Sequence, residues 1–377
     1  MEEEKKLSFF EKYLTLWILL CIGVGIALGR LAPGLAVALD SFSVAQISIP
    51  IAVCMFFMLY PIMVKLDFSQ LVKVTKSPKP ILISLGINWL IKPFTKYFLA
   101  ILFLGIIFRP LLPGTEIVAS GQEVELWQSY VSGAILLGIA PCTAMVLMWS
   151  YLAKANNELT VVMSAINSLS MLFLFAPMAA WLLGGVGMII PWQTMLFSVL
   201  IYVALPLAAG YVSRRLIIEK KGLDWFNEHF IQWLTPVSIL ALLVTLILLF
   251  SFKGDVIIEN PLTILWISIV LIVQIFIIFI LSYFGISRWF KLPYEDAAPV
   301  GLIGTSNHFE VAFATAALLF GIGSGAALAA VVGVLIEVPV MLLLVEICKR
   351  TRHIFPEKAP AGVPGETEPA PTGKMIE

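Results

Sequence analysis

Four charged residues lie inside long apolar stretches of the chain and are the first candidates for chemistry: Lys92, Lys96, Glu310 and Glu337. An ionisable side chain inside a membrane costs about 2.5–3.5 kcal/mol on insertion scales, so each one needs a partner or a function. A buried carboxyl group can bind and release a proton, which makes Glu310 and Glu337 candidates for proton coupling. The two lysines can pair with an acid or extend their ammonium groups toward the membrane surface.

Cys142 is a candidate of another kind, because it stands between Pro141 and Thr143 in an apolar stretch. Proline inside a helix removes a backbone N–H and displaces the carbonyl four residues earlier, so we expect a helix break here. A thiol at such a break can bind a soft, thiophilic solute. The other three cysteines read as small hydrophobic side chains: Cys21, Cys54 and Cys348. No Cys-x-x-Cys pair occurs, so we expect neither disulfides nor a metal cofactor.

A second polar cluster interrupts a later apolar stretch without a proline at the matching position. It consists of Gly301, Gly304, Thr305, Ser306, Asn307 and His308, and Glu310 follows two residues later. Polar residues of this kind satisfy freed backbone groups or line a cavity. Gly304 is the predicted start of this break, and His308 is equally a proton carrier or a satisfied interior histidine. Two further buried amides are secondary candidates, Asn88 and Asn167; we expect Asn167 to support a helix break rather than contact a solute.

The composition excludes most soluble classes of protein. Of 377 residues, 60% are hydrophobic and 13% charged, with 24 basic residues against 24 acidic ones. Soluble domains contain about 25% charged residues, and this chain could not cover its surface with polar groups. The balanced charge offers no footprint for nucleic acid. The chain is therefore predicted to be a polytopic membrane protein, with the lipid bilayer as its surroundings.

Ten stretches are long and apolar enough to cross a bilayer as helices. They are residues 13–32, 44–64, 80–108, 129–153, 159–183, 191–213, 230–251, 261–286, 297–320 and 325–348. Continuous apolar runs rather than alternation favour helices, so the predicted fold class is all-α. We expect one transporter domain over residues 1–355 and a disordered polar tail over 356–377, which is rich in Pro, Gly, Thr and Glu.

The loops between these stretches differ in charge. Basic residues follow every even-numbered stretch: Lys65, Lys73, Lys76, Lys79, Lys154, Arg214, Arg215, Lys220, Lys221, Arg288, Lys291, Lys349, Arg350 and Arg352. The intervening loops are mixed or uncharged; their charged residues are Arg30, Arg109, Glu116, Glu123, Glu125, Lys253, Asp255 and Glu259. Because loops rich in Lys and Arg stay in the cytoplasm, we expect a multi-pass protein of the cell membrane with both termini cytoplasmic.

The chain also contains a predicted internal repeat. Gly138 precedes Pro177 by 39 residues, and Gly304 precedes Pro339 by 35 residues. Each half contains five stretches, and because five is an odd number, the second half starts on the opposite side of the membrane and has the inverted orientation. Repeat one covers about 13–183 and repeat two about 191–348. Inverted repeats with broken helices near the midplane are typical of secondary transporters.

Three motifs resemble those of a known family. They are Gly-Ile-Ala-Pro-Cys-Thr-Ala-Met-Val-Leu-Met-Trp-Ser (138–150), Asn-Trp-Leu-Ile-Lys-Pro (88–93) and Gly-Thr-Ser-Asn-His-Phe-Glu-Val-Ala (304–312). Together they resemble the arsenite efflux permeases of the bile acid/arsenite/riboflavin transporter superfamily, over roughly residues 10–350. The run Val-Leu-Ile-Glu-Val-Pro-Val-Met at 334–341 fits the same resemblance.

The resemblance implies ten helices in two inverted five-helix repeats, with helices 4 and 9 broken and crossing. It implies export of As(III), in some members also Sb(III), in exchange for protons. Cys142, Thr143, Ser306, Asn307 and Glu310 would bind the solute, and Glu310 and Glu337 would couple the proton. No cofactor, no metal beyond the arsenic substrate and no obligatory protein partner is implied.

Lys92 departs from the pattern of that family, in which we expect a small residue, and its role stays open, as does that of Lys96. The alternative function is sodium-coupled uptake of an organic anion, as in the bile acid branch of the superfamily. We do not expect an enzyme, because the apolar stretches contain no Ser–His pair, His-Glu-x-x-His motif or paired Asp motif.

Overall fold

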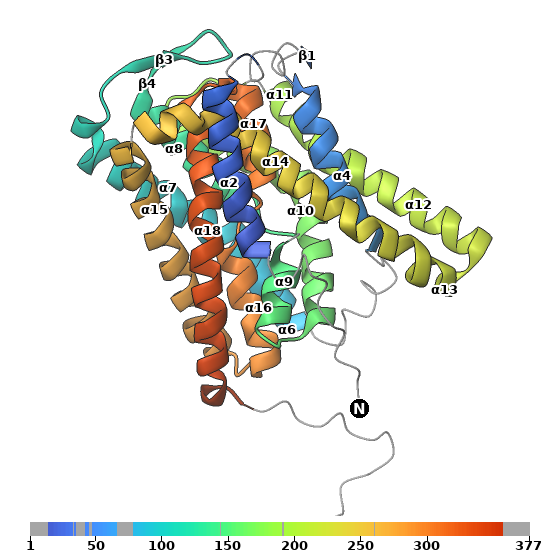
Figure 1. Cartoon of the computed structure of the whole chain (residues 1–377). Coiled ribbons are helices and arrows are strands. Elements are labelled where there is room, and N and C mark those ends of the chain that lie inside the picture. The colour runs from blue at the N-terminus through green and yellow to red at the C-terminus, as the bar shows by residue number, and fades with distance from the viewer. Residues whose placement is uncertain are drawn as a thin grey trace, which may run out of the picture.

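The computed structural model describes residues 14–32, 34, 42–44, 47–65, 78–143, 145–190, 192–259 and 261–356. These residues are almost entirely helical (Figure 1), and two short antiparallel ribbons complete the described secondary structure. One ribbon pairs β1 (Ser43–Val44) with β2 (Ile47–Ser48), and the other pairs β3 (Thr115–Ile117) with β4 (Glu123–Glu125). The predicted tail, apart from its first residue, lies outside the described residues.

Six helical segments among the described residues are long and apolar enough to cross a membrane. They are Pro78–Ile107, Asn157–Gly184, Gln193–Lys221, Leu223–Leu248, Pro261–Ser287 and Gly325–Arg350. Shorter apolar helices accompany them, including Leu126–Ile139 and Phe309–Phe320. The outer faces carry many exposed large hydrophobic side chains, as a lipid-facing surface requires. The chain is therefore a polytopic membrane protein.

Most helices form a body that we call the core bundle. It contains α6 (Pro78–Gly86), α7 (Lys92–Ala100), α8 (Leu126–Ile139), α9 (Met145–Leu152), α10 (Asn157–Gly184), α15 (Pro261–Phe279), α16 (Tyr294–Thr305), α17 (Phe309–Phe320) and α18 (Gly325–Arg350). In this bundle α18 packs on α8, α15 and α17, and α7 packs on α8 and α15. Segments from both ends of the chain thus share one interior.

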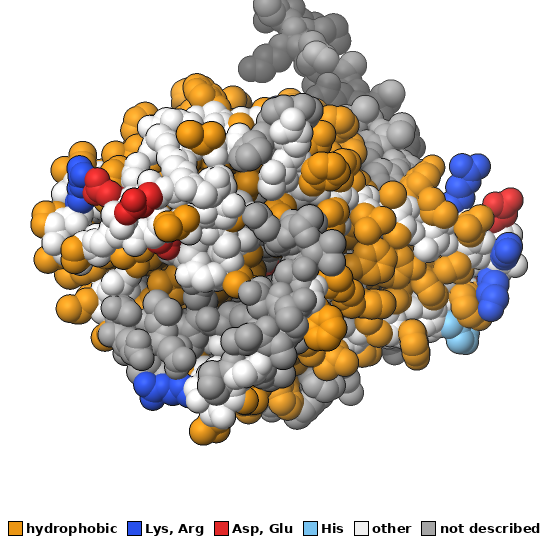
Figure 2. All heavy atoms as spheres, turned by 90° about the horizontal axis from the view of Figure 1, so that it is seen from above, with side chains coloured by type: hydrophobic (Ala, Val, Ile, Leu, Met, Phe, Trp, Pro, Cys, Tyr) orange, Lys and Arg blue, Asp and Glu red, His pale blue; other side chains and the backbone are white. Residues whose placement is uncertain are grey.

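The remaining long helices form a layer beside the core bundle, which we call the panel. It contains α2 (Leu14–Leu31), α4 (Ile49–Lys65), α12 (Leu205–Lys221) and α14 (Ile231–Glu259). Helix α14 packs along α2 and α4, and α12 packs along α4 (Figure 1). Figure 2 shows wide hydrophobic areas on this side of the molecule. Helix α11 (Trp192–Val199) packs against α10 and α17 of the core bundle.

Helices α8 and α18 approach each other closely because glycines line their contact. A Cβ atom on Gly133 would press into the backbone of Ala326, and one on Gly333 would lie 2.5 Å from Leu137 Cδ2. Small residues at helix contacts let backbones come close in membranes, where packing rather than the hydrophobic effect drives association. These contacts fix α8 against α18.

Two panel helices are longer than predicted. Helix α12 continues to Lys221, because the positive charges of the lysines in its last turn interact favourably with the helix dipole. Gly222, with φ of 84°, ends the helix. Helix α14 continues to Glu259, so residues 253–259 are helical, although we predicted a loop there from their charges. Charge alone does not end a helix, and the next helix begins only at Pro261.

The connecting segments gather at two opposite ends of the core bundle. At one end, Gln128 Nε2 donates to the Val186 carbonyl and Gly325 N donates to the Glu116 carboxylate. The first bond joins the start of α8 to the chain after α10, and the second joins the β3–β4 segment, at the top of Figure 1, to the start of α18. At the other end, Asn156 N donates to the Glu295 carbonyl and Arg352 pairs with the Glu295 carboxylate at 2.8 Å.

Candidate functional site: two helix breaks that meet

The first break separates α8 from α9. Helix α8 ends at Ile139, Ala140 is extended with φ −82° and ψ 102°, and α9 begins at Met145. Pro141 stands in this gap, where its missing N–H and its ring prevent the helix from continuing. Cys142 and Thr143 therefore lie in non-helical backbone inside the protein, and both side chains are buried.

The second break separates α16 from α17. Helix α16 ends at Thr305, Ser306 is extended with φ −76° and ψ 152°, and α17 begins at Phe309. The helix continues through Gly304, so the break that we predicted at this residue begins two residues later, at Ser306. Gly304 instead permits close packing: a Cβ atom there would lie 2.9 Å from Ile87 Cγ2.

The two breaks contact each other through their backbones. Pro141 and Asn307 form an isolated antiparallel bridge, and His308 N donates to the Ala140 carbonyl at 2.9 Å. Backbone groups freed by a break need such partners inside a membrane protein. Each break thus supplies hydrogen-bonding partners for the other, although they are more than 160 residues apart.

Glu337 of α18 binds the second break at three points. Its Oε1 accepts hydrogen bonds from Ser306 Oγ at 2.5 Å and Asn307 N at 2.8 Å, and its Oε2 accepts one from Asn307 Nδ2 at 3.1 Å. Helix α18 brings the carboxylate there by running through the bundle beside α17. A buried carboxylate with three donors is well satisfied.

Lys92 reaches the same break from α7. Its Nζ donates to the Ser306 carbonyl at 2.5 Å, and the side chain is fully buried. We gave two interpretations of Lys92, pairing with an acid or extension of its ammonium toward the membrane surface. The second does not hold, because the ammonium lies inside the bundle. It also lies within electrostatic reach of Glu337 and Cys142. Lys92 of α7 and Glu337 of α18 therefore both bind Ser306, the first at its carbonyl and the second at its hydroxyl.

Cys142 lies against this cluster and completes it. Its thiol is hydrogen-bonded to the Ser306 side chain, which also binds Glu337. Next to it, Thr143 Oγ1 has no hydrogen-bond partner among the described residues, and neither does Asn307 Oδ1. A thiol, a free hydroxyl and a free amide oxygen thus lie at one junction, where a small polar solute could find partners.

Glu310 and His308 form a pair of their own at the start of α17. Glu310 Oε2 lies 2.8 Å from His308 Nδ1, and each side chain is 3% exposed. The pair places two buried titratable side chains within two residues of the second break.

The amides Asn88 and Asn167 are buried as well, but they bind each other. Asn88 Nδ2 lies 3.4 Å from Asn167 Oδ1 and 3.4 Å from Ser84 Oγ. Helix α10 is continuous through Asn167. The two residues link α10 to the segment before α7, which carries Lys92.

Several residues that we did not predict from the sequence position the helices that carry the candidate site. Ser129 Oγ accepts from Ala326 N at 2.8 Å, and Glu116 accepts from Gly325 N, so both bind the start of the helix that carries Glu337. Tyr294 OH donates to the Ala153 carbonyl and joins the two broken segments at their outer ends. These pairs are far apart in sequence, and no local pattern could have indicated them.

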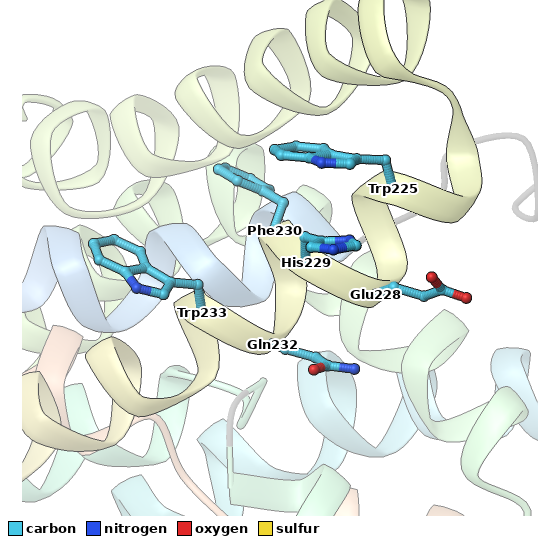
Figure 3. Close-up of a pocket in the computed structure, with 6 residues that line it drawn as sticks. All are labelled: Trp225, Glu228, His229, Phe230, Gln232 and Trp233. Carbon is cyan, nitrogen blue, oxygen red and sulfur yellow. The ribbon is translucent and has the colours of Figure 1, made fainter.

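A surface hollow lies elsewhere, on the panel (Figure 3). It is lined only by side chains from one short segment, Trp225, Glu228, His229, Phe230, Gln232 and Trp233. Aromatic residues at a helix end are typical of the membrane–water interface. None of the predicted site residues lies there.

Comparison with known proteins identifies related chains. Residues 52–260 match the model of a family described as "Sodium Bile acid symporter family". The chain is 60% identical over 350 residues to the uncharacterized transporter slr0944 of Synechocystis sp., covering 93% of this chain and 91% of the relative. It is 47% identical over 359 residues to the arsenical-resistance protein Acr3 of Alkaliphilus metalliredigens (95% and 98% covered) and 32% identical over 349 residues to Acr3 of Corynebacterium glutamicum (90% and 89%). These matches confirm the resemblance that the motifs indicated.

Proposed function

The chain belongs to the Sodium Bile acid symporter family, and from this premise we propose that it is a secondary transporter that exports arsenite from the cytoplasm across the cell membrane. Two relatives that match nearly the whole chain carry the name arsenical-resistance protein. Membership in a family of transporters also supports our interpretation that the chain is not an enzyme.

The observation that carries the proposal is the thiol of Cys142 at the contact between the two breaks. Arsenic(III) is a soft centre that favours sulfur ligands. A single thiol holds it more weakly than a set of three would, which suits a carrier that must release its solute. Arsenite at neutral pH is mostly an uncharged trihydroxide, and the unpartnered Thr143 Oγ1 and Asn307 Oδ1 offer hydrogen bonds to its hydroxyl groups.

The proposal includes exchange for protons, with Glu310 and Glu337 as the coupling acids. Glu310 has the nearby partner His308, with which it can share a proton. Glu337 binds Ser306 and Asn307, so protonation of its carboxylate would loosen the second break. A proton arriving from outside would favour arsenite release there, and its loss to the cytoplasm would restore the site.

We further propose ten membrane spans in one domain, arranged as two inverted repeats. Each predicted stretch overlaps a described helix or a pair of helices separated by a break, such as α8 with α9 and α16 with α17. The two breaks pair with each other as symmetry-related elements would. The contiguous body formed by the core bundle and the panel agrees with a single domain.

The orientation we propose leaves both termini in the cytoplasm. The connections bearing Glu116, Glu123 and Glu125 meet at one end of the core bundle, and those bearing Lys154 and Arg352 meet at the other. The basic end is the cytoplasmic one by the distribution of Lys and Arg.

The test is arsenite accumulation in everted vesicles from a host that lacks its own arsenite exporter, energised by an imposed pH gradient. We expect uptake that collapses with a protonophore, and a parallel arm with antimonite defines the second solute. Cys142→Ser should reduce the arsenite rate by roughly tenfold or more, which corresponds to about 1.4 kcal/mol of lost interaction.

Cys21→Ser is the matched control, because Cys21 is a buried cysteine of the panel and should leave transport unchanged. Normal transport by Cys142→Ser would remove the thiol from the mechanism. Uptake of an organic anion such as taurocholate that requires sodium, with no arsenite flux, would favour the alternative function.

A further inference from the structure

Lys92 is held by a special local geometry. The helix before it widens over Ile87–Ile91, and Lys92 N donates to the Ile87 carbonyl, five residues back. Pro93 follows directly and cannot donate a backbone hydrogen bond of its own. Widened turns of this type are frequent at functional sites. This turn aims a long cationic side chain into the interior, toward the second break.

The groups around the ammonium make a site for a cation. Ser306 lies at the C-terminal end of α16, where its carbonyl accepts the Lys92 hydrogen bond. Glu337 supplies a carboxylate from α18. In transporters, unwound carbonyls and the C-terminal ends of half-helices coordinate the sodium ion or proton that drives transport. The oxygens here are of that kind, and an ammonium is already covalently attached among them.

Among the described residues, four other titratable groups lie around Lys92 and Glu337. Cys142 faces Lys92 from the first break, and Lys96 follows one turn later on the same helix. Glu310 and His308 pair with each other at the start of α17. Glu337 is thus the acid within electrostatic reach of Lys92 whose carboxylate also binds the backbone of the second break.

We infer that Lys92 is a tethered cation: its ammonium binds the Ser306 carbonyl at the end of α16, on the residue whose hydroxyl Glu337 binds, and takes the place that a free sodium ion would need, so transport requires no sodium. This inference rests on the proposed function for its transport readout. It assigns Lys92 as a positioning and ion-specificity residue, because it holds the second break rather than the solute.

Lys96 provides a matched comparison. It is equally buried, but its Nζ has no hydrogen-bond partner among the described residues, and its stem packs against Gly138. A neutral residue of similar length should replace it with little effect on the second break. The two lysines therefore separate the effect of a cation bound to Ser306 from that of a positive charge in the bundle.

The experiment measures arsenite uptake into everted vesicles under a fixed pH gradient, in sodium chloride and in choline chloride. Wild type and Lys96→Met should transport equally in both salts. Lys92→Met should lose transport about tenfold or more in both, because its side chain fills the space without a charge. Lys92→Ala, which leaves space, should be slow in choline and recover at least in part with sodium or ethylammonium chloride.

A second measurement does not depend on arsenite. Purified Lys92→Ala in detergent should gain about 2–4 °C in Tm when sodium chloride replaces choline chloride, as expected for about 1 kcal/mol of ligand binding. Wild type should show no such gain. Sodium stabilisation or stimulation of wild type would overturn the inference, as would wild-type transport by Lys92→Met. If wild type moves no arsenite, the proposed function fails, and the Tm measurement still decides whether Lys92 replaces a free cation.

Discussion

The two breaks differ in what holds them. The second break, at Ser306–His308, receives hydrogen bonds and charge from outside its own segment: Glu337 reaches it from α18 and Lys92 from α7. The first break, at Ala140–Thr143, contains a proline and binds the second through its backbone. The unpartnered Thr143 hydroxyl belongs to the first break, beside Cys142.

This difference suggests a division of labour. The anchored break is held by charged side chains from two other helices, and the proline break presents the soft thiol beside the unpartnered Thr143 hydroxyl. The first, proline-containing break hydrogen-bonds to the backbone of the second, anchored break. A substitution that destabilises the second break should therefore affect both breaks, while one in the first break should have a local effect. Four substitutions, taken from the largest expected effect to the smallest, test this asymmetry.

Glu337→Ala should be the most destructive change. It leaves the Ser306 hydroxyl and both Asn307 donors without their acceptor and leaves Lys92 uncompensated. Removing one partner of a buried charged network costs about 3–5 kcal/mol. We expect a large fall in Tm in detergent together with loss of transport. Glu346→Ala, on the same helix but at an exposed ion pair, should leave Tm unchanged; equal Tm values for the two variants would refute the anchoring role.

A pair of hydroxyl deletions compares the breaks directly. Ser306→Ala removes a hydrogen bond to a carboxylate, worth about 1.5–3 kcal/mol, and should lower the free energy of unfolding by that order. Thr143→Val removes a buried hydroxyl with no described partner, so stability should be unchanged or slightly higher, while arsenite affinity falls. Thermal unfolding and half-saturating arsenite concentrations measure the two effects; a larger stability loss in Thr143→Val than in Ser306→Ala would reverse our comparison.

Pro141→Ala should have the smallest effect. Alanine can donate a backbone hydrogen bond and lets α8 extend by a few residues, which draws Cys142 away from Ser306. We expect transport to fall severalfold, equivalent to about 1 kcal/mol, with Tm close to wild type. Unchanged kinetics would mean that the proline does not set the position of the thiol, and a collapse in Tm would mean that the first break anchors the fold.

Much of the candidate site could be predicted from the sequence because the relevant signals are local. A proline beside a cysteine in an apolar stretch, and a run of polar residues before Glu310, mark interruptions that few membrane helices carry. The positions of buried acids follow from the cost of ionisable groups in lipid. Gly304 was misread because a glycine in a membrane helix serves close packing as well as flexibility.

Other features could not be predicted, because they depend on which helices become neighbours. The role of Lys92 was open until α7 was seen beside α8 and α15, with its ammonium at Ser306. The three bonds of Glu337 likewise depend on the path of α18 past α17. The lengths of α12 and α14 were underestimated because charged residues end an apolar stretch but not a helix.

The glycines between α8 and α18 have a consequence for the mechanics of the molecule. The two helices are in backbone contact at Gly133, and at Gly333 the side chain of Leu137 lies directly against the glycine, so little room is left for the helices to slide. They therefore behave as one rigid unit, in which α8 ends at the first break and α18 carries Glu337. This rigid pair sets the distance between the Cys142 thiol and the Glu337 carboxylate, although the glycines at the contact have no reactive groups of their own. An alanine at Gly133 would press against the Ala326 carbonyl and would change that distance without altering any side chain of the two breaks.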